Sequence, residues 1–78
     1  MAVRDKALHE AARKKVHELR QPLNVIGLAS GMIRLRILPL LDPAAAAYLI
    51  AKLDHIDEEV SRADVLAEQL VQSVSPEA

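Results

Sequence analysis

The chain of 78 residues contains no cysteine, no tryptophan and no phenylalanine, and Tyr48 is its only tyrosine. The absence of cysteine excludes disulfide bonds and thiolate metal sites. A core of this size is marginally stable alone and often depends on oligomerisation. The few glycines and prolines, set against abundant aliphatic residues and alanine, are typical of a helical bundle or a coiled coil.

Two further absences concern location and partners. The chain has no long uncharged apolar run, and its N-terminus lacks the ordered regions of a secretory signal. We therefore expect no membrane span, no direct membrane contact and a cytoplasmic location. The net charge of −1 gives no bias toward nucleic acid, so no nucleic-acid partner is expected.

Two long apolar patterns predict two helices, at about residues 3–38 and about residues 43–74. In both, apolar residues recur in alternating steps of four and three, the seam spacing of a left-handed bundle. The seam of the first helix is Ala12, Val16, Leu19, Leu23, Ile26, Ser30, Ile33 and Ile37. The seam of the second is Leu49, Leu53, Ile56, Val60, Ala63, Ala67, Leu70 and Val74.

The connection between the helices is predicted at about residues 39–42. The first helix should end near Leu38 because the residue before Pro39 disfavours helix. Asp42 is a good N-cap, and Pro43 suits the first helical position. Within the first helix, Gly27 and Gly31 indicate close helix approach or local softness.

A short connection joins antiparallel helices, so the fold class is all-α, with a two-helix hairpin. Two helices alone cannot cover each other's wide apolar faces. We therefore predict one domain over residues 1–78, whose hairpin dimerises symmetrically into a four-helix bundle. The expected assembly is an obligate homodimer.

Charge is divided between the two helices. Through Leu38 the chain has eight bases and three acids, and from Pro39 onward it has two bases and eight acids. This pattern favours complementary helix flanks that pair when packed. For Arg20 two interpretations stay open, namely contact with an anion and pairing with an acid of the second helix.

The stretch at residues 17–24 reads His-Glu-Leu-Arg-Gln-Pro-Leu-Asn. Pro22 within a helix removes a backbone hydrogen bond, at a cost of about 3 kcal/mol. Because this cost has no local benefit, we expect the bend beside His17 to serve a function. His17 follows the seam residue Val16 and should point to the flank, where a neutral imidazole is a competent nucleophile. Glu18 is placed to hold the other ring N–H or to accept a proton. His9 and His55 have no helical partner histidine, and no metal site is predicted.

The stretch from His17 to Leu23 resembles the H-box of sensor histidine kinases, usually written His-Glu-Leu-Arg-x-Pro-Leu. That box lies in their dimerisation and histidine phosphotransfer domain, a two-helix domain like the one predicted for about residues 6–74. The resemblance implies that His17 is the phosphoacceptor, that Glu18 is its acid–base neighbour and that Pro22 produces a helix kink. Gln21, the third candidate catalytic residue, stands where members with phosphatase activity commonly have Thr or Asn. Gln is longer but also donates and accepts hydrogen bonds, so phosphatase activity stays open.

The resemblance also implies partners and cofactors. No cofactor is expected in this chain, because ATP and Mg²⁺ would bind a separate catalytic domain. That catalytic domain is one expected partner. That leaves open whether the chain counts as an enzyme by itself. The phosphoryl group would pass to an aspartate of a response-regulator receiver domain, docked near Val25, Ala29, Met32, Tyr48 and Ala51. The alternatives are a non-catalytic dimerisation or scaffold module of a signalling protein and a stand-alone phosphorelay protein.

Overall fold

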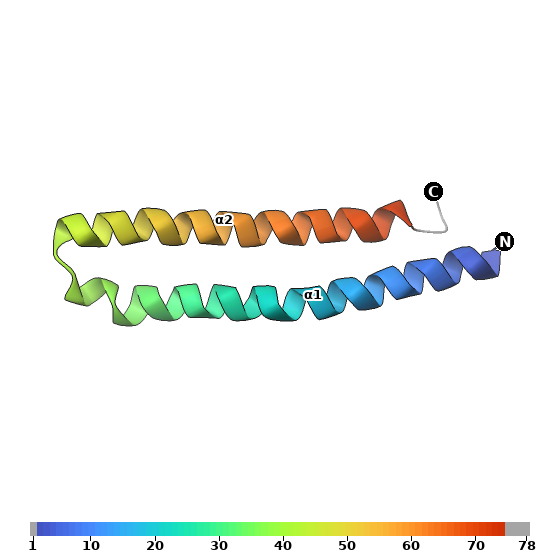
Figure 1. The fold of residues 1–78 in the computed structure, drawn as a ribbon, viewed down its shortest axis with the longest axis horizontal. Helices are drawn as coiled ribbons and strands as arrows, with labels where there is room; N and C mark the ends of the chain where they lie inside the picture. The colour runs from blue at the N-terminus through green and yellow to red at the C-terminus, as the bar shows by residue number, and fades with distance from the viewer. Residues whose placement is uncertain (1, 75–78) are drawn as a thin grey trace.

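The computed structural model describes residues 2–74, with side chains from residue 6 onward, as an antiparallel helical hairpin (Figure 1). Helix α1 spans Ala2–Arg36, a short 3-10 helix, η1, spans Leu38–Leu40, and helix α2 spans Pro43–Ser73. No strand occurs among these residues. The two helices pack against each other, which confirms the predicted all-α hairpin.

The junction differs in detail from the expected loop. Helix α1 ends at Arg36, and Leu38–Leu40 form a 3-10 turn instead of irregular loop. The Leu40 N–H donates to the Ile37 carbonyl at 2.9 Å, closing that turn around Pro39. The start of α2 agrees with the sequence, because the Asp42 carboxylate accepts from the Ala45 N–H at 2.8 Å and Pro43 occupies the first turn.

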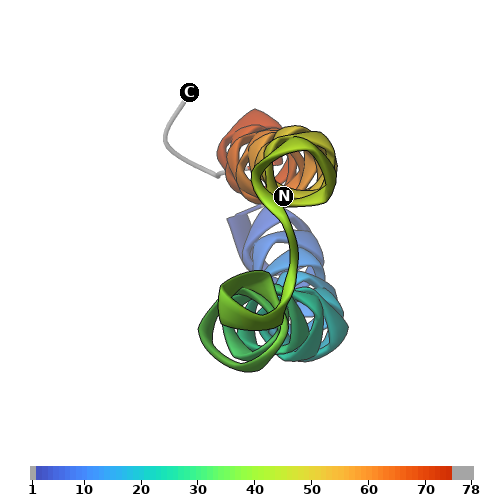
Figure 2. The same cartoon turned by 90° about the vertical axis from the view of Figure 1, so that its left-hand side faces the viewer.

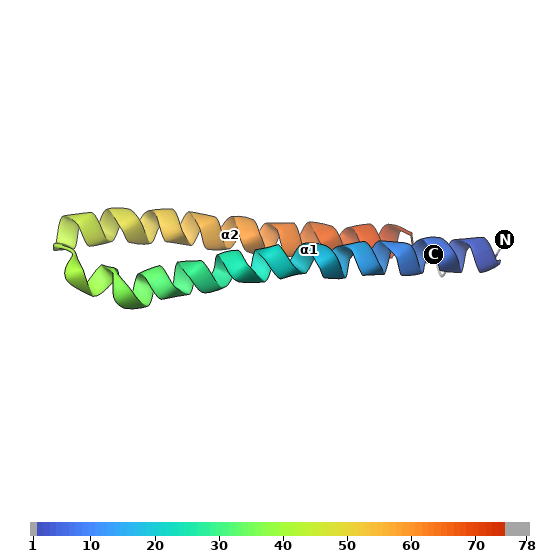
Figure 3. The same cartoon turned by 60° about the horizontal axis from the view of Figure 1, so that its bottom comes forward.

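Helix α1 continues through Pro22 without a break. Proline has no N–H, so the carbonyl of Glu18, four residues earlier, loses its usual helical donor. Figures 1 and 3 show α1 gently bent, with its blue N-terminal part running in a different direction from its teal and green part. Helix α1 is therefore gently bent but continuous through the proline.

The predicted seam is only half used within one hairpin. Three seam residues of α1 face α2: Val16 and Ser30 are buried, and Leu23, midway between them, is half-buried. Across from them, Leu53 and Ala67 are buried and Val60 is half-buried. Leu49 and Val74 are also half-buried, whereas six large apolar seam residues stay exposed, namely Leu19, Ile26, Ile33, Ile37, Ile56 and Leu70. Seen end-on in Figure 2, the two helices form a single pair, and the described residues add no further layer to it.

The two glycines do not mark a close approach within the hairpin. A Cβ atom added at Gly27 or at Gly31 would meet nothing within 4 Å. The sequence-based expectation of close helix approach at this pair is therefore wrong inside one chain. Both glycines lie on the exposed surface of α1.

The hydropathy of the first helical segment also differs from expectation. By length and composition alone, the segment Lys6–Leu40 is apolar enough to cross a membrane, with a mean hydropathy of 1.4 over its most apolar 18 residues. Core helices of soluble proteins and signal sequences near an N-terminus meet the same criteria. The expectation of no membrane span rested on the lack of a long uncharged apolar run, and one helix that meets these criteria is weak evidence for a span.

Candidate functional site

His17 lies on the exposed flank of α1, one residue after the buried Val16. Successive residues of an α-helix point about 100° apart, so burial of Val16 against α2 turns the imidazole toward solvent. The sequence predicted this orientation from the seam alone. The ring is therefore reachable from outside the hairpin.

The imidazole borders a small surface pocket between the two helices. The pocket has a volume of about 170 Å³ and is lined by Arg13, Val16, His17 and Arg20 of α1 and by Glu68 and Val71 of α2. Val16 and Val71 are buried and give it an apolar base. Arg13 is four residues before His17 and Arg20 three residues after it, so all three side chains share one helix face. The site is thus a histidine with an arginine about one helical turn to either side of it along α1.

Arg20 pairs across the hairpin. Its Nη2 lies 2.6 Å from a carboxylate oxygen of Glu68, and its Nε lies 3.8 Å from Asp64. Of the two interpretations left open by the sequence, the structure shows the pairing with acids of the second helix. The predicted complementarity between a basic and an acidic flank holds at this position.

Glu18 and Gln21 do not join His17 in the pocket. The nearest ion-pair partner of the Glu18 carboxylate is Lys15, at 3.6 Å from Nζ. Between residues 6 and 74, no hydrogen bond links Glu18 to the His17 ring. Gln21 and Pro22 are exposed and lie outside the pocket lining. The arrangement brings Arg13 and Arg20 to the histidine instead, and sequence analysis had not assigned Arg13 any role.

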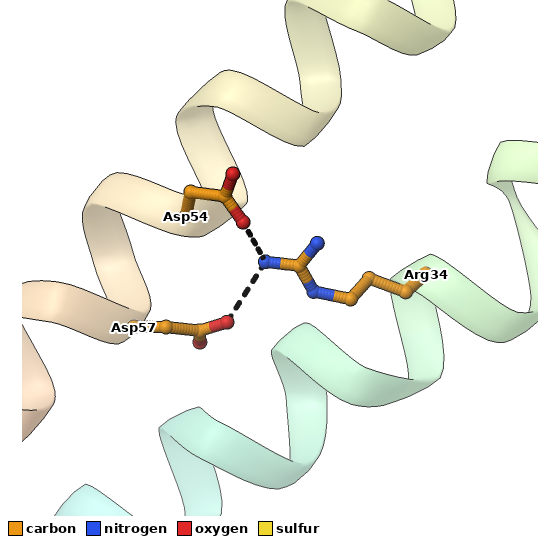
Figure 4. Close-up of polar contacts among 3 residues, drawn as sticks. All are labelled: Arg34, Asp54 and Asp57. Carbon is orange, nitrogen blue, oxygen red and sulfur yellow. Dashed lines mark hydrogen bonds and ion pairs between the residues drawn. The ribbon is translucent and has the colours of Figure 1, made fainter.

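A second cross-helix contact lies nearer the turn. Nη2 of Arg34 is 2.8 Å from Asp54 and 2.8 Å from Asp57, so one nitrogen of α1 bridges two carboxylates of α2 (Figure 4). Its bond to Arg34 lowers the pKa of the Asp57 carboxyl below the usual 3.8, and the bonds to Asp54 and Asp57 raise the pKa of Arg34. The buried Ser30 hydroxyl adds to the lowering at Asp57, although its geometry falls short of a hydrogen bond.

The sequence contained a signal for this contact. Arg34 follows a seam position of the basic helix, and Asp54 and Asp57 are three residues apart on the acidic helix, so both acids share one face. The charge pattern predicted paired flanks. It did not say which residues meet, because that depends on how the short turn sets one helix against the other.

The remaining histidines lie apart from His17. His9 is half-buried on α1 and its Nδ1 has no hydrogen-bond partner among residues 6–74. His55 borders an open apolar groove on the other side of the seam, with Leu23, Ile26, Ile56, Glu59 and Val60. Over the described range, no three His, Asp or Glu side chains gather as metal ligands.

The residues expected to meet a receiver domain are all exposed. Val25, Ala29 and Met32 lie on α1, and Tyr48 and Ala51 lie on α2. The ammonium of Lys52 sits 5.2 Å from the centre of the Tyr48 ring, a cation–π contact at the surface. These residues are therefore available to a partner.

Comparisons with known proteins add no relative, since no protein-family model, no curated protein and no solved structure matches this chain. The arguments about function come from the residues and the geometry described above.

Proposed function

We propose that this chain is the dimerisation and phosphoacceptor domain of a two-component sensor histidine kinase. The observation that carries the proposal is the placement of His17, which stands within an H-box-like stretch, exposed, on a pocket lined by Arg13 and Arg20. An exposed neutral imidazole is a competent nucleophile near neutral pH. Flanking guanidinium groups favour the approach of a phosphoryl group, which is negatively charged.

The chemical step needs little from this domain beyond placement. The lone pair of one His17 ring nitrogen attacks the γ-phosphorus of ATP held by a separate catalytic domain. A P–N bond forms, the P–O bond to ADP breaks, and its electron pair leaves with ADP. The other ring nitrogen then loses its proton to a base. Glu18 acts as that base once its carboxylate moves away from Lys15, which lies 3.6 Å from it and is mostly exposed.

The second half of the reaction passes the group onward. A receiver aspartate attacks the phosphorus, the P–N bond breaks, and the electron pair returns to the ring of His17. The receiver would dock on the exposed face around Met32 and Tyr48. ATP, the catalytic domain and the receiver are cytoplasmic in such systems, so the proposal places this domain in the cytoplasm.

Dimerisation forms part of the same proposal. Leu19, Ile26 and Ile33 on α1 and Ile56 and Leu70 on α2 remain exposed at seam spacing. A second hairpin laid on this surface would bury them in a four-helix bundle, with His17 still on the outer flank. The charge change Ile56→Asp should separate the dimer, because it would bury an unpaired carboxylate. Sedimentation of Val65→Asp, at an exposed position off the seam, provides the control. An Ile56→Asp dimer as stable as the control would overturn this interface.

The phosphoacceptor proposal is tested by labelling. The chain is incubated with ATP, Mg²⁺ and an isolated kinase catalytic domain, and the label is examined for its stability in acid and alkali. We expect an acid-labile, alkali-stable label that disappears in His17→Gln and persists in His55→Gln, a control at another exposed histidine. A folded chain that remains unlabelled would contradict the proposal.

A scaffold without phosphoryl chemistry is the second candidate. The exposed apolar seam favours it, because dimerisation alone would account for that surface. A stable dimer without label on His17 is the outcome that selects the scaffold. Transfer of label between receivers in both directions would instead select a phosphorelay protein.

A further inference from the structure

Two arginines and one glutamate line the pocket beside His17. Arg13 and Arg20 flank the imidazole one turn to either side, and both line the pocket with it. Arg13 has no ion-pair partner in the part of the chain whose side chains are described, and Arg20 is held by Glu68 and Asp64. Both arginine side chains therefore line the pocket that borders the ring to which a phosphoryl group would be attached.

The ion pairs between Arg20 and the acids of α2 are exposed enough for Arg20 to change partners. The Arg20 side chain is 41% exposed, and those of Asp64 and Glu68 are 42% and 52% exposed, so water and salt screen both pairs. A phosphoryl group carries up to two negative charges and three acceptor oxygens. Guanidinium binds such groups through two parallel hydrogen bonds. A phosphoryl group three residues away on the same face therefore competes well against these two exposed carboxylates.

We propose that Arg20 is a positioning residue with two alternative partners. In the unmodified chain it pairs with Glu68 and Asp64, and once His17 carries a phosphoryl group it turns to the phosphoryl oxygens, with Arg13 on the opposite side. The inference rests on the proposed function, because it needs a phosphoryl group on His17. It adds that phosphorylation releases the cross-helix contact at this level of the hairpin.

The chemical consequence concerns the lifetime of the P–N bond. In hydrolysis, water attacks the phosphorus, the P–N bond breaks, and the electron pair returns to the His17 nitrogen, which leaves readily only when the ring is protonated. Nearby positive charge disfavours that protonation. Arg20 turned toward the phosphoryl group should therefore slow hydrolysis and keep the group available for transfer.

The test follows the decay of phosphohistidine in two opposing variants. The chain is labelled with phosphoramidate, whose P–N bond to ammonia breaks as the bond to His17 forms, and with the kinase catalytic domain in parallel. We expect Arg20→Gln to shorten the lifetime about 3- to 10-fold, because it removes a positive charge that opposes protonation of the leaving ring. Glu68→Gln should leave the lifetime equal or longer, because it frees Arg20 without removing it.

Controls separate positioning from folding. Arg36→Gln removes an exposed arginine of the same helix, far from the pocket lining, and should match the unmodified sequence. Arg20→Lys keeps the positive charge but cannot form two parallel hydrogen bonds, so it should give an intermediate lifetime. Circular dichroism of each variant checks that the hairpin is formed.

The outcomes are distinct. If Glu68→Gln shortens the lifetime as much as Arg20→Gln, the ion pair acts structurally and the inference is overturned. Label on His17 with an unchanged lifetime in Arg20→Gln overturns the inference and leaves the proposed function intact. A folded chain that takes label from neither donor overturns both.

Discussion

Arg20 and Arg34 make the same kind of contact across the hairpin, yet their surroundings differ. Arg34 directs one nitrogen to two aspartates at 2.8 Å, and its side chain is 30% exposed. Arg20 is 41% exposed and makes one contact of 2.6 Å and one of 3.8 Å. Only Arg20 lines the pocket with His17. One arginine links the two helices near the turn, and the other stands where the proposed exchange of partners would take place.

The buried side chains near the two arginines also differ, and they are larger near Arg34. Near Arg34, the buried residues include Leu53, a large aliphatic side chain, and Ser30. Near Arg20 the buried cluster consists of Val16, Ala67 and Val71, all smaller than Leu. Smaller side chains fill less of the space between the helices and leave the pocket open beside His17. We infer that the turn half of the hairpin is the more rigid half.

The largest expected effect compares the two packing clusters. Leu53→Ala should lower the free energy of unfolding by about 2–5 kcal/mol, the range for buried leucines that leave a cavity. Val71→Ala should cost about 1.5 kcal/mol, because it removes fewer buried carbon atoms than Leu53→Ala does. Urea denaturation followed by circular dichroism, at one fixed chain concentration, measures both. Equal losses would contradict the proposed difference between the halves.

The sequence predicted the fold better than it predicted the site. The steps of four and three, with Asp42 and Pro43 at the start of α2, were enough for the helices and the hairpin. Periodicity did not reveal which seam positions a single hairpin buries, because Val16 and Leu19 look equivalent in a heptad. Only the offset of one helix against the other separates the buried residue from the exposed one.

For the site, the orientation of His17 followed from its neighbour Val16. The sequence did not indicate a role for Arg13. This residue lies four positions before His17, and it became a candidate only because the structure shows a pocket lined by both side chains. Glu18 was expected to reach the ring, yet its flexible carboxylate pairs with Lys15 in the structure. Side-chain partners at an exposed surface depend on small energy differences that sequence patterns do not carry.

The next prediction concerns Pro22, which lies in the site half of α1. Pro22→Ala would restore the N–H that the Glu18 carbonyl lacks, and should raise the free energy of unfolding by up to about 3 kcal/mol. The gain should reduce the difference in rigidity between the two halves. Hydrogen exchange of the amides around His17, compared with those around Ile33, measures that difference. Unchanged exchange and unchanged stability would show that the bend carries no strain.

The smallest effect concerns the ion pairs and pH. At neutral pH, Arg34→Gln should lower the thermal midpoint more than Arg20→Gln, because it removes two bonds of 2.8 Å from a less exposed side chain. The bond from Arg34 lowers the pKa of Asp57 below 3.8 in the folded chain. Its contribution is therefore complete above that value and is lost as pH falls below it through the folded pKa.

Thermal unfolding between about pH 7 and about pH 2.5 tests the sign of this effect. The stability advantage of the unmodified chain over Asp57→Asn should be constant near neutrality and should shrink below about pH 4. Arg34→Gln should lose the same pH dependence, because the lowered pKa of Asp57 comes first from that arginine. An advantage that persists at the acid end would mean that Asp57 stabilises the hairpin by packing and not by charge, and the contrast between the two arginines would then lose its electrostatic basis.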